Sequence, residues 1–144
     1  STVPDDDPQE QRTMLDEHTR ALAKGVNFAT LTTLRKDGSP TAQVMWVDCD
    51  DEHILINTEV HRVKYRHMVR DPRVVVVIID RENPYSYSEI RGEVVEFVRG
   101  DAARAHIDEL SERYFGRPYI QEQIESERVI CRIRPVSRVA EGAR

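Results

Sequence analysis

The residues that could bind a charged ligand are concentrated in one short segment. Between positions 61 and 73 a single acid, Asp71, opposes five basic side chains, which are Arg62, Lys64, Arg66, Arg70 and Arg73. Arginine offers a phosphate a planar fork of donors and lysine a mobile point charge, so Arg62 and Lys64 together could hold one phosphate group. If a helix begins near position 63, both lie at its N-terminal end, where free N–H groups and the helix dipole favour an anion.

A second interpretation of this basic segment stays open. Arg66, Arg70 and Arg73 follow helical spacing, and a solvated helix face with surface ion pairs would have the same composition. Arg70 is expected on the outer face of the helix. The solvated-face interpretation also remains open for Arg62 and Lys64.

A group of aromatic and amphipathic side chains could form a slot for a flat ring. Met45 and Trp46 lie on one predicted strand, and Tyr85 and Tyr87 precede another. Such side chains can wall a ring-binding cavity. Equally, the only tryptophan of a small barrel can simply fill its core.

No established catalytic motif is present. The sequence lacks a nucleophile elbow, a zincin motif, a P-loop and a dinucleotide-binding glycine pattern. The histidines lack metal-ligand spacing, so no metal is expected, and the acidic segment 48–52 is interpreted as a solvated hairpin turn. No residue stands out as a proton donor. A phosphate anchor and a ring slot without acid–base machinery indicate chemistry carried by a bound cofactor.

Composition limits the class of protein. Of the 144 residues, 39% are hydrophobic and 33% charged, which is typical of a folded domain. A net charge of −5 argues against a nucleic-acid partner, and no apolar run approaches the roughly 18 residues of a membrane span. Residues 1–12 are polar and acidic, unlike a secretory leader, which predicts a cytoplasmic location. We expect residues 1–8 to be a flexible lead-in and residues 9–144 to form one domain.

Periodicity and turn residues predict three helices and six strands. The helices cover 9–24, 63–70 and a segment that Asp101 can cap. The strands cover 28–34, 41–48, 53–58, 74–79, 88–98 and 128–133. Since strands and helices do not alternate regularly, the pattern favours a mainly β (α+β) fold: a closed or partly closed antiparallel six-stranded barrel with peripheral helices.

Three details of this prediction can be checked directly. The first three strands should form an antiparallel meander. The β-branched run 74–79 is typical of a strand buried on both faces, and 80–87 is predicted to be a loop. Gly92 is expected at a bulge, and Pro135 lies beyond the last predicted strand.

Several segments resemble one known family. The segments 28–33, 37–40 and 43–46 are similar to the opening of the split-barrel flavin-binding family that includes pyridoxamine-phosphate oxidases. The most specific similarity is to its branch that uses the deazaflavin coenzyme F420, and it spans Asn57-Thr58, Arg62-Val63-Lys64, Arg66-His67-Met68 and Asp71-Pro72-Arg73-Val74. Overall the resemblance covers residues 27–139.

The resemblance implies a fold, a cofactor and site residues. It implies an FMN-binding type of split barrel, with F420 as cofactor and FMN as the alternative. Arg62 and Lys64 match the pair that anchors the deazaflavin phosphate, near Asn57 and Thr58. The remaining positions matched to cofactor-binding ones are Gln43, Val44, Met45 and Trp46 along the ring, His67 without an assigned role, and Tyr85 and Tyr87 beside the cofactor.

The resemblance also implies an activity and an assembly. It indicates an F420-dependent reductase, an oxidoreductase that transfers a hydride to an unsaturated small-molecule acceptor. The family generally forms homodimers with cofactor sites between subunits, to which Tyr85 and Tyr87 could contribute across the interface. Three alternatives remain: an FMN-dependent oxidase of the same fold, a non-catalytic carrier of flavin, deazaflavin or haem, and a structural domain that binds none of these ligands.

Overall fold

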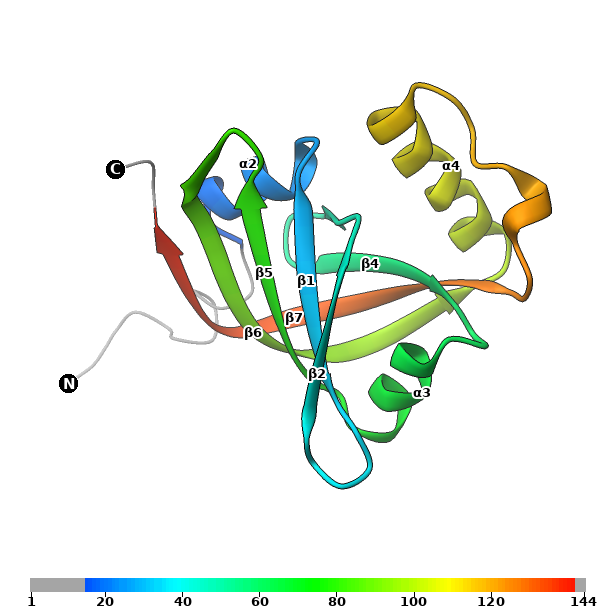
Figure 1. The fold of residues 1–144 in the computed structure, drawn as a ribbon, viewed down its shortest axis with the longest axis horizontal. Coiled ribbons are helices and arrows are strands. Elements are labelled where there is room, and N and C mark those ends of the chain that lie inside the picture. The colour runs from blue at the N-terminus through cyan, green and yellow to red at the C-terminus, as the bar shows by residue number, and fades with distance from the viewer. Residues whose placement is uncertain (1–14, 142–144) are drawn as a thin grey trace.

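A computed structural model describes residues 15–141, which form seven strands, three α-helices and one short 3-10 helix (Figure 1). The strands are β1 (Phe28–Leu34), β2 (Pro40–Met45), β3 (Asp48–Cys49), β4 (Ile54–Glu59), β5 (Arg73–Asp80), β6 (Asn83–Arg99) and β7 (Arg128–Glu141). The helices are α2 (Glu17–Lys24), α3 (Val63–Arg70), α4 (Asp101–Phe115) and the 3-10 helix η1 (Gln121–Gln123).

All seven strands belong to one antiparallel sheet with the order β2-β1-β5-β6-β7-β4-β3. The sheet curls but does not close, since β2 and β3 stand at its two edges. Strand β6 bends so that it runs beside β5 and then continues with β7 toward β4 (Figure 1). The predicted antiparallel split-barrel class is therefore confirmed, but the strand count of six was wrong, because the two-residue strand β3 was assigned to a turn.

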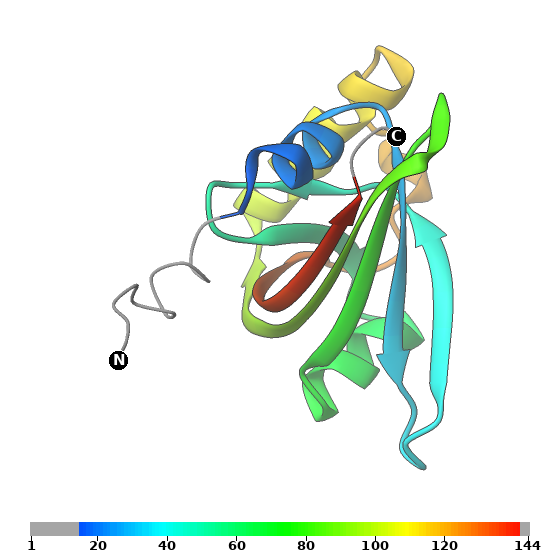
Figure 2. The same ribbon diagram turned by 90° about the vertical axis from the view of Figure 1, so that its left-hand side faces the viewer.

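The hydrophobic core lies inside the curl of the sheet. Its largest fully buried members come from several strands, and they include Leu31, Ile54, Ile56, Ile78, Ile90 and Ile133. Helix α2 adds Leu22, and α3 adds Met68. Figure 2 shows α2 and α4 at one end of the curled sheet and α3 at the other, beside the β1–β2 hairpin.

Helix α2 covers the later part of the predicted helix 9–24, and positions 9–14 lie outside the described residues. It begins after Asp16, whose side chain accepts a hydrogen bond from the Thr19 N–H. At α4 the predicted cap was wrong. Gly100, with a φ of 84°, precedes the helix, and Asp101 is its first residue. None of the described helices is both long and apolar enough to cross a membrane.

The three-stranded meander was also wrong. Strand β2 pairs only with β1, and β4 pairs instead with β3 and β7. The chain leaves the β2 register at Val47, whose N–H donates to the Tyr114 hydroxyl and whose carbonyl accepts from Arg113. Contacts with α4 thus turn the chain away from β1 and leave β2 as an edge strand.

Strand β5 is not buried on both faces, which corrects the interpretation of its β-branched run. Val74, Val76 and Ile78 are buried, whereas Val75 and Val77 are half-buried and Ile79 is 37% exposed. A continuous aliphatic run does not show in the sequence which of its faces is covered within one chain. The second face of β5 is apolar and partly open.

The last two long strands extend beyond their predicted bounds. The predicted loop 80–87 was wrong, since β5 and β6 join through a tight turn and β6 starts at Asn83. Strand β7 continues through Pro135, which lies opposite Gly92, where the register with β6 shifts as predicted for a bulge. A proline lacks an N–H, and a bulge is where a sheet tolerates this.

Gly92 makes the close approach of β6 and β7 possible. A Cβ at this position would lie 2.7 Å from the Arg134 carbonyl oxygen and 2.7 Å from Cγ2 of Ile133. The carbonyl belongs to the paired backbone and cannot move without disturbing the bulge.

We therefore expect Gly92→Ala to lower the free energy of unfolding by about 1–3 kcal/mol, the usual cost of overpacking. Chemical denaturation of both proteins measures this difference. Val95→Thr, which keeps a β-branched side chain at an exposed position of β6, should change stability by no more than about 0.5 kcal/mol. Equal stability of Gly92→Ala and wild type would show that the bulge adjusts freely.

Candidate functional site

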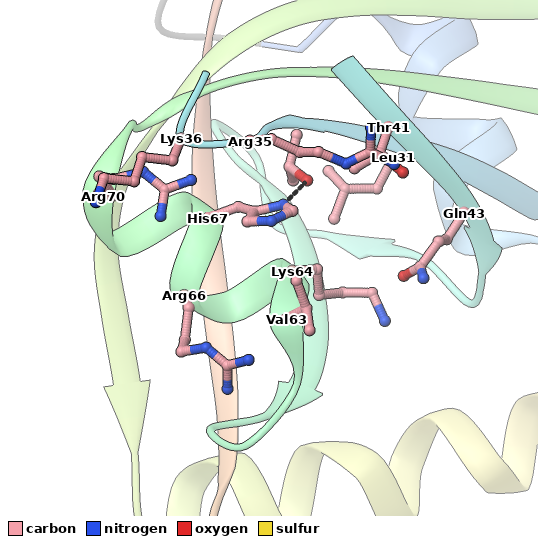
Figure 3. Close-up of a pocket in the computed structure, with 11 residues that line it drawn as sticks. Leu31, Arg35, Lys36, Thr41, Gln43, Val63, Lys64, Arg66, His67 and Arg70 are labelled. Carbon is pink, nitrogen blue, oxygen red and sulfur yellow. Dashed lines mark hydrogen bonds between the residues drawn. The ribbon is translucent and has the colours of Figure 1, made fainter. Parts of the chain in front are cut away.

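A cavity of about 560 Å³ lies between the β1–β2 hairpin and α3 (Figure 3). We call it the basic cavity, because five of its lining side chains are cationic and none is a carboxylate: Arg35, Lys36, Lys64, Arg66 and Arg70. Leu31, Thr33, Thr41, Gln43, Val63 and His67 complete the lining. Figure 3 shows Gln43 and Lys64 extending toward one another from β2 and α3.

Two of the three helically spaced arginines are both exposed and part of the basic cavity. Arg70 is exposed, as expected, but it also lines the basic cavity and donates from Nη2 to the Leu34 carbonyl at 3.2 Å. Arg66 lines the same cavity, whereas Arg73 forms an exposed ion pair with Asp71 at 2.8 Å. All three arginines are exposed, and only Arg73 of the three lies outside the lining of the basic cavity. Helical spacing does not distinguish these cases, because the cavity wall opposite α3 comes from a distant hairpin.

The N-terminus of α3 carries an unusual charge pattern. Its N-cap residue, Arg62, makes no side-chain capping hydrogen bond, and the first turn holds no acid. A helix N-terminus favours negative charge, yet here Arg62 and Lys64 surround it. No hydrogen bond or ion pair joins either side chain to another residue in the described part of the chain. Local repulsion is therefore unrelieved within the described protein, and an anion would relieve it.

The surroundings of Lys64 also disfavour a positive charge. Burial lowers the pKa of its ammonium group, and the guanidinium groups of Arg62 and Arg128 lower it further. Each of these influences disfavours the charged lysine, and no neighbouring carboxylate offsets them. A phosphate or carboxylate placed among Arg62, Lys64 and Arg128 would stabilise the charged lysine and raise its pKa.

Lys64 also lines a second cavity of about 290 Å³, beside the end of β2 and the inner face of α4. We call it the mixed cavity. Apolar side chains form part of its lining, and they are Val44, Met45, Ile107 and Leu110. Trp46 and Tyr119 add aromatic surface, while the polar lining consists of Asn57, Thr58, Arg62, Lys64 and Arg128. The lining fits a ligand with a flat apolar part and an anionic part.

An aromatic cluster adjoins the mixed cavity, which its members Trp46 and Tyr119 line. Trp46 stacks on Tyr114, with ring centroids 4.8 Å apart and 5° between the planes. Phe115 and Tyr119 approach the Trp46 ring edge-on at 5.2 and 6.3 Å. Sequence analysis assigned no site role to Tyr114, Phe115 or Tyr119. A stretch of two aromatic residues at a helix end, followed closely by a third, was the available signal.

A chain of hydrogen-bonded polar side chains holds Asn57 and Arg128, two of the residues that line the mixed cavity. Glu59 accepts from Arg128 at 3.0 Å, and the Nε of Arg128 donates to Oδ1 of Asn57 at 2.8 Å. Nδ2 of Asn57 lies 3.0 Å from Nδ1 of His106, whose Nε2 lies 2.8 Å from Asp48. Asp48 also accepts from Arg113 at 2.6 Å. The chain thus crosses from β4 and β7 to α4 and β3.

The proton positions in this chain follow from chemistry. Arg128 can only donate, so the Asn57 atom that faces it is oxygen, and the amide nitrogen then faces His106. Nδ1 of His106 must accept that hydrogen bond, so its proton resides on Nε2 and is donated to Asp48. Every link has one donor and one acceptor.

Asp48 corrects another expectation. It was assigned to a solvated turn, but it is only 5% exposed and also forms a 3.1 Å ion pair with Lys24 of α2. Burial alone would raise the pKa of Asp48, but hydrogen bonds from His106 and Arg113 outweigh it and hold the pKa far below its usual value. Asp48 therefore stays ionised and ties α2 and α4 to the sheet edge.

The structure gathers most of the matched residues around the two cavities. Gln43, Lys64 and His67 line the basic cavity. The mixed cavity is lined by Val44, Met45, Trp46, Asn57, Thr58, Arg62 and again Lys64. Tyr85 and Tyr87 line neither, and they lie near the start of β6, away from both. Residues that sequence analysis missed are Arg35, Lys36, Tyr119 and Arg128, each distant in sequence from the basic segment.

Comparison with known proteins gives a consistent result. The chain matches a family model described as pyridoxamine 5'-phosphate oxidase over residues 15–138. A solved structure described as an F420 reductase is 32% identical, with a TM-score of 0.75 over 87% of this chain and 98% of that chain. A conserved hypothetical protein from Mycobacterium tuberculosis is 26% identical, with a TM-score of 0.66 over 92% and 88% of the two chains.

General stress protein 26 from Bacillus anthracis shares the fold at 18% identity, with a TM-score of 0.65 over 87% of this chain and 92% of that chain. No curated protein matches the sequence. The matches confirm the expected family resemblance, which rested on residues 27–139, and the split-barrel class.

The buried carboxylate of Asp48 yields a test of how the site is held together. Asp48→Asn leaves Arg113 and Lys24 without their charged partner, so the free energy of unfolding should fall by about 3 kcal/mol at pH 7. Because the folded-state pKa is lowered, the stabilisation is present above the unfolded value near 3.8 and is lost as the pH falls toward the folded pKa. The difference in the free energy of unfolding between variant and wild type should therefore stay constant from pH 8 to 5 and decrease below about pH 4.

Urea denaturation at each pH measures this difference. Asp51→Asn is the matched control, since Asp51 is exposed and forms its ion pair with Arg20 at the surface. We expect this control to change stability by less than about 1 kcal/mol. A difference that stayed constant down to pH 2 would contradict the role assigned to the Asp48 carboxylate.

Proposed function

This chain belongs to the pyridoxamine 5'-phosphate oxidase family, and we propose that it is an F420-dependent oxidoreductase that moves a hydride to an unsaturated organic acceptor. The family and its split-barrel architecture are of a flavin-binding oxidoreductase type. One observation carries the choice of F420: the unpaired cations extend from the N-terminus of α3 through the whole basic cavity.

The phosphate position follows from the charges around α3. Arg62, Lys64 and Arg128 converge on the mixed cavity, and the first turn of α3 has neither a capping side chain nor an acid. A phosphate there would receive charge-assisted hydrogen bonds from the two flexible side chains. Arg128 is already held by Asn57 and Glu59, so it would add its charge from a fixed position.

The ring position follows from the end of β2. This edge strand is exposed along most of its length, and Val44, which is 68% exposed, leaves apolar surface open to a ligand or partner. Met45 and Trp46 line the adjoining mixed cavity together with Ile107 and Leu110. A flat ring system against these residues would bury apolar surface that is otherwise open to water.

The extent of the positive charge favours F420 over FMN. FMN carries a single phosphate, whereas the side chain of F420 continues beyond its phosphate into glutamyl carboxylates. Lys64 lines both cavities, and beyond it four further cations face the basic cavity with no carboxylate. A cofactor with several negative charges would occupy both cavities. The similarity to a structure described as an F420 reductase supports the same choice.

The residues would contribute binding and orientation. Reduced F420, when bound, supplies the hydride. Arg62 and Lys64 would hold its phosphate, the β2 edge would fix the plane of the ring, and the Trp46–Tyr114–Phe115 cluster would limit access of water. These residues act by placing the donor close to the acceptor.

We also propose that the protein acts as a homodimer. The outer face of β5 presents Val75, Val77 and Ile79, and an apolar groove of about 340 Å³ lies beside them, between β1, β5 and β6. Tyr85 is 72% exposed and lies away from both cavities. A second copy packed on this face would bury the open valines and bring Tyr85 and Tyr87 toward the ring bound by its partner.

The phosphate anchor is tested by Arg62→Ala and Lys64→Ala. Each should remove a charge-assisted hydrogen bond of roughly 1.5–3 kcal/mol, which corresponds to about a 10- to 150-fold loss in F420 affinity. Quenching of the single tryptophan, Trp46, provides the binding signal, because it lines the mixed cavity. The variants should be at least as stable as wild type, since each loses a repulsive charge.

Arg20→Ala serves as the control, because Arg20 lies on α2 and pairs with exposed Asp51. It should bind F420 as wild type does. Unchanged F420 affinity in both anchor variants would place the phosphate elsewhere. Parallel titrations with FMN and haem, followed by turnover of a model enone with reduced F420, separate the reductase from an FMN oxidase and from a carrier.

The dimer is tested by sedimentation. We expect a species of twice 16.7 kDa at micromolar concentration, and Val77→Glu should shift it to the monomer by placing a charge in the interface. Val95→Glu, at an exposed position of β6, is the control and should remain dimeric. A wild-type monomer at these concentrations would contradict the proposal.

A further inference from the structure

His67 is the one titratable group of the basic cavity that is nearly fully buried. Its side chain lines the cavity from α3 and is only 8% exposed. Nδ1 forms a 2.9 Å hydrogen bond with the Thr33 hydroxyl of β1, which is itself 2% exposed (Figure 3). Nε2 has no hydrogen-bond partner in the described part of the chain. Nε2 is not sealed from solvent, so a ligand that enters the basic cavity can reach it.

The surroundings of His67 disfavour its protonation. Burial lowers the pKa of the imidazole, and the guanidinium groups of Arg70, Arg35 and Arg66 lower it further. The charged groups that face the cavity come from α3 and from the β1–β2 hairpin, and they are Arg35, Lys36, Lys64, Arg66 and Arg70. Thr41 and Gln43 of β2 add only neutral groups. His67 is therefore neutral at pH 7 while the cavity holds no anion.

An anion in the cavity would invert these influences. It would offset the charges of Arg35, Arg66 and Arg70 and present an acceptor to the open Nε2. The Thr33 hydroxyl can donate to a neutral Nδ1 or accept from a protonated one, so this contact survives the gain of a proton. The cavity can thus hold His67 in both protonation states without losing a hydrogen bond.

We propose that the basic cavity is a proton-coupled binding site for a multiply charged carboxylate or phosphate anion, with His67 as the group that takes up the proton. The proton comes from solvent and resides on the imidazole, which then donates Nδ1–H to Thr33 and Nε2–H to the anion. Two sources share this chemistry: the glutamyl tail of the cofactor and a free polyanion. The first source rests on the proposed function, and the second does not.

Proton coupling has a measurable signature. Affinity for the anion should rise as the pH falls from 8 to 6, by up to about tenfold per pH unit. Calorimetry of wild type with tripolyphosphate, triglutamate and F420 at pH 6.5, in two cationic buffers with different heats of ionisation, counts the protons taken up. We expect about 0.5–1 proton per bound probe.

Two variants identify the proton acceptor. His67→Gln keeps a hydrogen-bonding side chain that cannot titrate, and it should bind with no proton uptake and little pH dependence. Lys64→Arg keeps the cation but cannot release a proton, so its uptake should equal that of wild type. Nuclear magnetic resonance of the histidine rings provides an independent readout, in which the signal missing from His67→Gln should titrate at higher pH when a probe is bound.

The outcomes separate this proposal from the proposed function. Wild-type binding of the probes without proton uptake, or equal uptake by His67→Gln, overturns the proton-coupled site even if F420 binds. Coupled binding of tripolyphosphate by a protein that does not bind F420 supports the site, assigns it to a free polyanion and contradicts the proposed function. Coupled binding of F420 assigns the site to the cofactor tail.

Discussion

The carboxylate of Asp48 is the anchor of the polar chain on which the geometry of the mixed cavity depends. It lies on the shortest strand of the sheet, yet it receives hydrogen bonds from two α4 side chains and an ion pair from α2. Through His106 and Asn57 the same chain reaches Arg128 and Glu59, so the position of α4 and the direction of the Arg128 guanidinium are set together. A buried charge is tolerated at such a place because each of its neighbours is a donor.

The molecule distributes its charges unevenly, and this distribution carries the functional argument. Its net charge is −5, and most buried or half-buried acids have cationic partners, as Asp48 and Glu59 do. The basic cavity is the opposite case, since its cations face one another without any acid. Such an arrangement opposes folding through self-repulsion. Its cost is removed when an external anion binds, which is why the imbalance indicates a binding site and not a structural cluster.

How much the sequence could predict depended on the range of the interactions involved. Strand β1 and helix α3 have their predicted bounds, because a segment rich in Thr, Leu and Ala and the Asp71-Pro72 pair are local signals. The pairing of β4 with β7, the burial of Asp48 and the orientation of Arg70 depend on segments far away in the sequence. Resemblance to a family pointed to residues of β2, β4 and α3, which the structure brings around the two cavities. Arg35 and Arg128 became visible only when the hairpin and β7 were placed around α3.

Lys64, which lines both cavities, has a consequence for how ligands compete. Two separate anions, one in each cavity, would share a single ammonium group and repel one another across it. Each anion would therefore lower the affinity of the protein for the other by the same factor. A single molecule with two anionic groups avoids this penalty in part, because its second group arrives at a high effective concentration once the first is bound. Lys64 would then select ligands by the spacing of their negative charges. It would favour ligands whose negative charges are spaced to reach both sides of one lysine over mixtures of smaller ions with the same total charge.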